Sequence, residues 1–228
     1  MNAHTVTLAN VLTIQKLSKK FGERFAVSQA SWSAQSGQII CLLGHSGCGK
    51  TTMLRLIAGL ETPTEGSIQL ERKVLWDQYQ QVQAEERNIG FVFQSFNLID
   101  ELNIYENVEL PLSYLKIKSS DRKEKVDEIL KRMNISHRAN HFPQQLSGGQ
   151  QQRVAIARAV VASPKLILAD EPTGNLDSKN GAEAMALLTE LNKEGTTIIM
   201  VTHSKHDSLF AHRTINLFDG GIVNNLEL

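Results

Sequence analysis

The stretch that most constrains how this chain folds is residues 44–51, because it joins a predicted strand to a predicted helix through a glycine-rich loop. Apolar residues 39–43 precede the loop, and residues 52–58 follow it with a helical pattern. Glycines let the backbone wrap closely around an anion, since they lack a Cβ atom. The pattern G-x-x-x-x-G-K-[ST] in this context predicts a cradle for the phosphates of a nucleoside triphosphate. The alternative is a glycine-rich turn without a ligand.

The chemistry expected of this loop follows from its residue types. A helix that begins near Lys50 directs its positive dipole end and free N–H groups at the phosphates. The Lys50 ammonium adds a point charge for the β- and γ-phosphates, and the Thr51 hydroxyl offers a ligand to Mg²⁺. The residues expected to bind the nucleotide are Gly44, His45, Ser46, Gly47, Cys48, Gly49, Lys50, Thr51 and Thr52.

Composition narrows the class of protein. The 228 residues suffice for one sizeable α/β domain or for two small ones. Basic and acidic residues number 24 each, and a balanced charge without a basic run argues against a nucleic-acid surface. Residues 1–10 lack the features of a signal peptide, and no apolar run approaches a membrane span. We therefore expect a cytoplasmic protein that reaches a membrane only through a partner.

The two cysteines bear on the redox state and on the loop. Cys41 and Cys48 lie too close together along one strand and loop for an obvious disulfide, which favours reduced thiols. Because Cys48 lies inside the glycine loop, we expect its alkylation to abolish ATP binding.

Polar residues follow three further buried strands. Residues 88–93, 165–169 and 196–202 are apolar runs, which end at Gln94, at Asp170 and Glu171, and at His203. In open α/β sheets, ligands bind outside the carboxyl ends of the strands. Asp170 fits a metal-holding aspartate and Glu171 a group that polarises the attacking water, while Gln94 fits a contact to Mg²⁺ or water. The alternatives are a strand-capping glutamine, a surface carboxylate pair and a structural histidine.

Between residues 95 and 161 the strand pattern gives way to helical periodicity, which predicts an inserted helical lobe. Within it, Ser147 is a good N-cap for a helix through residues 151–159, and the adjacent glycines expose backbone N–H groups to an anion. This second phosphate-binding helix start suggests a role on another molecule's nucleotide, against the alternative of an ordinary capped helix. Its residues are Ser147, Gly148, Gly149 and Gln150.

The remaining elements are shorter. Residues 11–16, 25–27 and 30–34 predict an antiparallel prelude of short strands, with Phe21 in a loop between them. Residues 71–86 carry no motif that we can assign. Gly181 leads into a predicted helix that Gly195 ends, and residues 213–223 read as a closing hairpin.

The order of these motifs resembles the ATP-binding subunit of ABC transporters over nearly the whole chain. The resemblance identifies residues 44–51 as Walker A, Gln94 as the Q-loop, residues 146–150 as the signature and residues 166–170 as Walker B. It implies Glu171 as the catalytic base, with Lys50, Gln94 and the switch histidine His203 also catalytic, and Thr51, Gln94 and Asp170 at the metal. It also implies Phe21 as the adenine-stacking aromatic and Asp177 in the loop that communicates across a dimer.

The resemblance further implies a fold and partners. The fold is α/β, a P-loop NTPase core with a mainly parallel sheet and an antiparallel β subdomain in residues 1–94 and 162–228, and a helical signature subdomain in residues 95–161. The cofactors are ATP and Mg²⁺. The partners are a second copy of the chain and an integral-membrane permease, which holds the subunit at the inner face of the membrane.

Residues 106–112 and 171–178 resemble the branch of the macrolide-exporter and lipoprotein-releasing ATPases. That branch implies a permease with a large periplasmic domain and conversion of ATP-driven dimer closure into mechanical work. The alternatives are the ATPase of another importer or exporter, a non-transport ABC ATPase, and a scaffolding protein with a degraded site.

Overall fold

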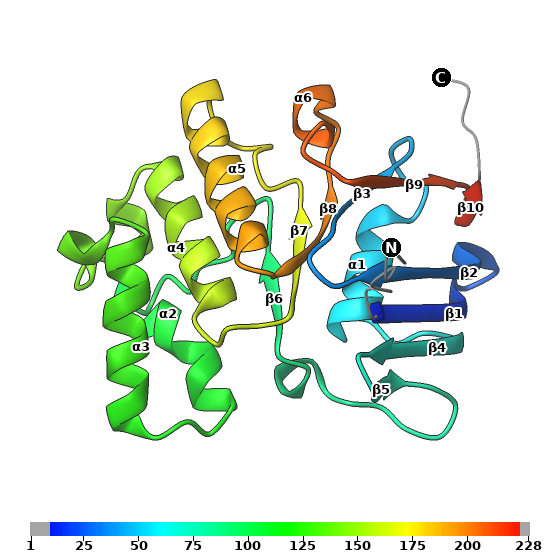
Figure 1. Ribbon diagram of the computed structural model, residues 1–228, viewed down its shortest axis with the longest axis horizontal. Helices are drawn as coiled ribbons and strands as arrows, with labels where there is room; N and C mark the ends of the chain where they lie inside the picture. The colour runs from blue at the N-terminus through cyan, green and yellow to red at the C-terminus, as the bar shows by residue number, and fades with distance from the viewer. Residues whose placement is uncertain (1–9, 224–228) are drawn as a thin grey trace, which may run out of the picture.

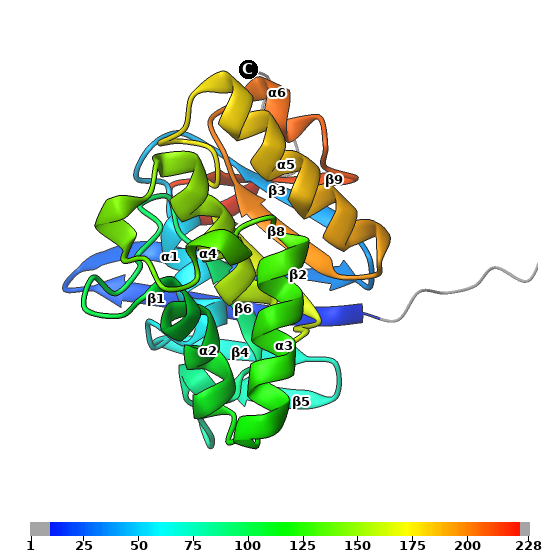
Figure 2. The same ribbon diagram turned by 90° about the vertical axis from the view of Figure 1, so that its left-hand side faces the viewer.

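The computed structural model describes residues 10–223, which form two sheets and a group of helices (Figure 1). The larger sheet has the strand order β10-β9-β3-β8-β7-β6, and the smaller sheet has the order β2-β1-β4-β5. Figure 2 shows that α2, α3 and α4 cover one end of the molecule, with the sheets behind them. This arrangement confirms the expected α/β fold with an antiparallel part near the N-terminus.

The larger sheet is built around a parallel centre. Strands β9, β3, β8, β7 and β6 run parallel, and β10 joins β9 as the predicted hairpin. The residues of β3, β7 and β8 are buried nearly throughout, as expected for strands covered on both faces. The strands are β3 (Ile39–Leu43), β6 (Ile89–Val92), β7 (Leu166–Asp170), β8 (Thr197–Val201), β9 (Arg213–Phe218) and β10 (Gly221–Val223).

The smaller sheet differs from the sequence prediction in detail. Two long strands, β1 (Asn10–Phe21) and β2 (Arg24–Gln35), pair antiparallel where several short strands were expected. Lys16 and Gln29 have positive φ values of 45° and 49° at irregularities in the pairing, which break the apolar alternation. The sheet is completed by β4 (Glu65–Leu70) and by β5 (Lys73–Trp76), a strand that no sequence pattern predicted.

The helices follow the expected order. From residue 95 to residue 161 the chain forms helices, turns and loops without a strand, as predicted. No helix within residues 10–223 is long and apolar enough to cross a membrane. The α-helices are α1 (Lys50–Ala58), α2 (Ile104–Tyr114), α3 (Ser119–Arg132), α4 (Gly148–Val160), α5 (Ser178–Lys193) and α6 (Lys205–Ser208).

The prediction for the start of α5 was wrong. The helix begins at Ser178 rather than after Gly181, because the Asp177 side chain accepts a hydrogen bond from the Asn180 backbone N–H and caps it. Gly181 is buried inside the first turns.

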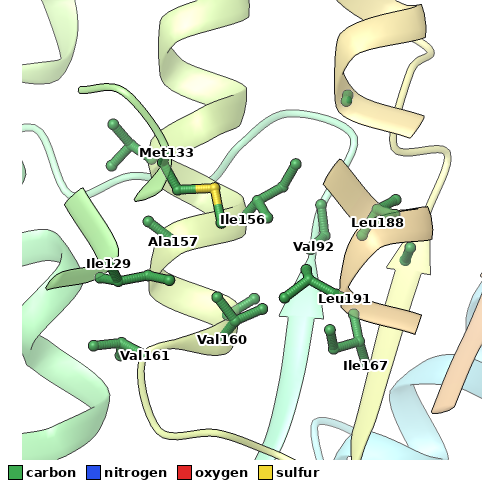
Figure 3. Packing of buried hydrophobic residues seen from close by; sticks show 14 of the residues in the cluster. Val92, Ile129, Met133, Ile156, Ala157, Val160, Val161, Ile167, Leu188 and Leu191 are labelled. Atoms are coloured by element: carbon green, nitrogen blue, oxygen red, sulfur yellow. The ribbon is translucent and has the colours of Figure 1, made fainter. Parts of the chain in front are cut away.

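Two apolar clusters fix the helices and sheets to each other. The first joins α2, α3, α4 and α5 to one face of the larger sheet, and Figure 3 shows side chains of α4 meeting those of α3, β6 and α5. The second joins α1 and the smaller sheet to the opposite face. The carboxyl ends of the parallel strands are thereby held at one edge, next to the start of α1.

Candidate nucleotide site

The loop between β3 and α1 has the backbone geometry of a phosphate cradle. Gly44 and Gly49 have φ values of 152° and 105°, which side chains rarely permit. A Cβ atom at Gly44 would collide with the Leu217 carbonyl oxygen, and one at Gly49 with the Ala26 carbonyl oxygen. Glycine is therefore required at both positions. The cap of α1 is Gly49, which offers no side-chain oxygen to the first N–H groups of the helix.

The Lys50 side chain points back into this loop. Its ammonium is buried and donates hydrogen bonds to the carbonyl oxygens of Gly44 (2.9 Å) and His45 (3.0 Å). The first turn of α1 contains no acidic residue. The loop thus gathers a fixed cation and a helix N-terminus, which together favour a bound anion.

The side chains of the loop differ in accessibility. His45 is half exposed, with Nε2 3.5 Å from Asp219 Oδ1, and its ring packs edge-on against Phe218. Cys48 is 1% exposed, and its Sγ lies 3.9 Å from Lys50 Nζ. Cys48 is therefore shielded from a thiol reagent in this conformation of the loop, and the expected effect of its alkylation on ATP binding stays a prediction.

Two oxygen-bearing side chains meet beside the loop. The Thr51 hydroxyl donates a 3.0 Å hydrogen bond to Asp170 Oδ1, which joins the start of α1 to the end of β7. Burial raises the pKa of the Asp170 carboxyl, although the Thr51 hydrogen bond opposes this shift. Within residues 10–223 no three His, Cys, Asp or Glu side chains cluster to hold a metal. This donor set fits Mg²⁺, which takes few protein oxygens and completes its shell with water and phosphate.

Gln94 lies at the expected sheet edge but contacts a different segment. A Cβ atom on Gly174 would lie 2.7 Å from Gln94 Nε2, and the Gln94 carbonyl oxygen accepts a hydrogen bond from Asn175 Nδ2 (3.0 Å). No hydrogen bond within residues 10–223 joins its side chain to Thr51 or Asp170.

Glu171 and His203 lie together after β7 and β8. The His203 backbone N–H donates a 3.2 Å hydrogen bond to Glu171 Oε2, and His203 Nε2 lies 3.2 Å from Glu171 Oε1. Oε1 is buried and makes no aligned hydrogen bond with residues 10–223. The imidazole is 59% exposed and the carboxylate side chain 17% exposed. The structure thus brings together two residues that the sequence analysis placed at the carboxyl ends of two buried strands.

The second helix start has the predicted cap. Ser147 Oγ accepts from the Gln150 backbone N–H (3.4 Å), and Gln150 Oε1 accepts from the Ser147 N–H (3.0 Å). The Gln150 side chain is therefore used in a capping box. A Cβ atom on Gly149 would collide with the Asn180 side chain of α5.

Phe21 and Asp177 occupy different settings. Phe21 lies at the tip of the β1–β2 hairpin and is 51% exposed, with Lys19 Nζ 4.8 Å from its ring centre. The neighbouring Phe25 is 46% exposed, and sequence reasoning did not select it. Hydrogen bonds from Asn180 lower the pKa of the exposed Asp177 carboxyl.

Two buried polar residues and one partly buried arginine near these motifs were not selected from the sequence. Gln152 and Asp207 are buried and hydrogen-bond to the segment after Glu171. Arg158 donates to the carbonyl oxygens of Phe96 and Asn97, and burial lowers its pKa to about 10. Gln152 and Arg158 lie on the helix predicted through residues 151–159. A polar residue among the apolar residues of that helix could have pointed to them in the sequence.

Comparisons with known proteins agree with this geometry. Residues 27–174 match the ABC transporter family model. The ABC transporter ATP-binding protein YtrE of Bacillus subtilis is 44% identical over 197 residues, which are 85% of each chain. The macrolide export ATP-binding/permease protein MacB of Aggregatibacter actinomycetemcomitans is 39% identical over 226 residues, covering 96% of this chain and 35% of that protein.

Solved structures give the same result. The dimeric structure of MJ0796, a bacterial ABC transporter cassette, superposes with a TM-score of 0.81 at 42% identity and covers 92% of this chain and 96% of that one. A dimeric post-hydrolysis state of the same cassette with ADP and Pi superposes with a TM-score of 0.82 at 41% identity, with the same coverage. The chain therefore belongs to the ABC transporter family, as an ATP-hydrolysing subunit.

Proposed function

We propose that two copies of this chain enclose two MgATP molecules, each held by the loop of one copy and by the start of α4 of the other. The observation that carries this proposal is that two helices have no negative side chain at their N-terminus. Within residues 10–223, α1 and α4 are the α-helices that have no carboxylate at the N-cap or in the first turn. Two positive helix ends in one chain suit two anionic contacts.

On the nucleotide-binding copy, residues 44–52 hold the phosphates and Lys50 offers its ammonium to the β- and γ-phosphates. Thr51, Asp170 and Gln94 hold Mg²⁺, which neutralises charge on the phosphate oxygens when bound. The 3.0 Å approach of Thr51 to Asp170 supports this metal position. Phe21, exposed at the hairpin tip, stacks on the adenine.

For the chemistry, Glu171 takes the proton of the attacking water and His203 donates a hydrogen bond to the γ-phosphate. Phosphoryl transfer depends mainly on positioning and charge stabilisation. The contact between Glu171 and His203 supports their action at one centre. Catalysis therefore requires the second copy, because the start of α4 in that copy excludes water and completes the γ-phosphate contacts.

On the second copy, the start of α4 faces the bound nucleotide. Its Ser147 hydroxyl and the N–H groups of Gly148 and Gly149 contact the γ-phosphate, and Gln150 supports them through the capping box. Asp177 lies in the loop that contacts the other copy. Residues 95–161 form the subdomain that carries this helix start in the proposed assembly.

We propose further that a membrane permease docks on the groove beside the Gln94 segment. What supports this is a hollow of about 630 Å³ with mostly apolar walls, lined by residues of α2, β6 and the end of α4. Leu60 and Tyr114 on its rim are 50% and 59% exposed. The permease carries a large periplasmic domain, and the subunit lies at the inner face of the membrane. Dimer closure then performs mechanical work on the permease, as expected for the branch of the macrolide exporter.

The test of the catalytic site is the Glu171→Gln substitution. It keeps the size of the side chain and removes the proton acceptor, so steady-state ATP hydrolysis becomes negligible while ATP still binds. Lys50→Ala serves as the comparison, because it weakens nucleotide binding itself. An unchanged hydrolysis rate in the Glu171→Gln variant would remove Glu171 from the catalytic role.

A further inference from the structure

The backbone at Glu171 adopts a conformation that residues other than glycine seldom adopt. Its φ value is 51°, in the left-handed region that non-glycine residues seldom occupy. The Glu171 N–H donates to the Val201 carbonyl oxygen (3.0 Å), and its carbonyl oxygen accepts from the Gly174 N–H (3.0 Å). Residues 171–174 therefore form a tight turn with Pro172 and Thr173 at its centre. The surrounding structure must hold such a strained residue in place.

Two side chains from distant helices hold the two central residues of this turn. Gln152 Nε2 of α4 donates a 2.6 Å hydrogen bond to the Pro172 carbonyl oxygen. The Thr173 hydroxyl donates a 2.6 Å hydrogen bond to Asp207 Oδ2 of α6. The turn is thus held by two residues that lie 20 residues before and 34 residues after their partners in the chain.

Both holding residues are polar groups in buried positions. Gln152 is 1% exposed and Asp207 is 6% exposed. Gln152 Oε1 has no hydrogen-bond partner within residues 10–223, so Gln152 contributes through its Nε2 donor. Leaving a buried oxygen unpaired is costly, and an apolar residue would avoid that cost. The bond to Pro172 therefore explains a polar residue at this position better than packing does.

The Asp207 carboxylate is itself held in position. Its backbone N–H donates to Ser204 Oγ at the start of α6 (3.1 Å), and His206 Nδ1 lies 3.4 Å from Asp207 Oδ1. The N-cap of α6, Ser204, directly follows His203. The segments after β7 and β8 are therefore joined twice. Glu171 contacts His203 directly, and the Thr173–Asp207 hydrogen bond joins the residues that follow them.

We infer that Thr173, Asp207 and Gln152 are positioning residues that hold the Glu171 carboxylate beside His203. This inference rests on the proposed catalytic role of Glu171. A misplacement of about 1 Å can reduce a rate by about a hundredfold, so loosening the turn lowers turnover without removing any group that touches the nucleotide.

The test is ATP hydrolysis by the Thr173→Val variant, which removes the hydroxyl and preserves the shape of the side chain. We expect kcat to fall about 10- to 100-fold with an unchanged KM for ATP, since the lost interaction affects only the chemical step. Thr173→Ser restores the hydroxyl and therefore the rate. Thr189→Val is the matched control, because Thr189 donates to the Met185 carbonyl oxygen within α5, away from the site.

Double variants with Glu171 distinguish a positioning role of Thr173 from a general structural defect. In single-turnover measurements, Thr173→Val should cause no further loss in a Glu171→Gln background, and Asp207→Ala should cause no further loss in a Thr173→Val background. A wild-type rate in Thr173→Val, or a loss that adds to that of Glu171→Gln, would overturn the inference. A wild-type rate in Glu171→Gln alone would instead overturn the proposed catalytic role of Glu171.

Discussion

Thr51 and Asp170 lie 119 residues apart in the chain, yet the Thr51 hydroxyl donates a 3.0 Å hydrogen bond to the Asp170 carboxylate. The contact forms because β3 and β7 are parallel strands on either side of β8, and both end at the same edge of the sheet. The pair places two oxygens that suit Mg²⁺ at the start of α1.

We predict that Asp170→Asn raises the thermal stability of the nucleotide-free protein and removes Mg²⁺-dependent ATP binding. Burial raises the pKa of Asp170, so its ionised form costs stability near pH 7. We expect a rise in Tm of a few degrees, because ~1 kcal/mol corresponds to about 2–4 °C in a chain of this size. Differential scanning calorimetry measures this change.

The pH dependence of that difference follows from the sign of the shift. As the pH falls through the folded-state pKa of Asp170, the wild-type carboxyl becomes neutral and its burial cost disappears. The Tm gap between the variant and the wild type should therefore narrow toward acid pH. A gap that widens there, or a destabilised variant at pH 7, would contradict this account of Asp170.

We predict that neither cysteine of the native protein reacts rapidly with a thiol reagent. Burial raises the pKa of the Cys41 thiol to about 12, and Cys48 is 1% exposed. The measurement is the absorbance released when the cysteines react with a chromogenic disulfide reagent. It should show two reactive thiols in the denatured protein and a slow reaction in the folded protein. Fast modification of Cys48 in the native protein would show that residues 44–51 open readily.

We predict that Tyr114→Asp weakens the binding of the membrane partner without changing basal ATP hydrolysis. Tyr114 lies on the rim of the apolar groove, and a carboxylate there disfavours contact with an apolar segment. The measurement is co-purification from solubilised membranes, followed by identification of the bound membrane protein. Tyr79→Asp is the matched control, because Tyr79 is 86% exposed and does not line the groove.

Two outcomes would contradict the docking proposal. Equal recovery of the membrane protein by Tyr114→Asp and Tyr79→Asp would place the docking surface elsewhere. A partner without a large extracytoplasmic domain would contradict the assignment to the branch of the macrolide exporter.

The sequence predicted those parts of the fold in which one local pattern corresponds to one strand or helix. Asp170 ends one buried apolar run and His203 follows another, so the parallel sheet places both at one edge. Lys50 begins the helix after the glycine loop that follows β3, so its place was predicted by the loop motif. The cap at Ser147 was also predictable, because capping depends on neighbouring residues. The roles assigned to these residues remain predictions.

Features that depend on tertiary contacts were not predictable. β5 has only four residues and is held by pairing with β4, so its own pattern is too short to recognise. The bulges at Lys16 and Gln29 divided two long strands into apparent short ones. The bond between Thr173 and Asp207 joins the turn after β7 to the short helix α6. The sheet brings these two segments together, and neither residue type reveals its partner.

The central claim is that the start of α4 completes the nucleotide site of a second copy, and light scattering after size-exclusion chromatography tests it most directly. With MgATP, Glu171→Gln should elute at twice the 25.4 kDa chain mass, because slow hydrolysis preserves the enclosed nucleotide. The double variant Glu171→Gln, Ser147→Arg should remain a monomer, since arginine blocks the helix start. A monomeric Glu171→Gln, or a double variant that dimerises equally well, would contradict the claim.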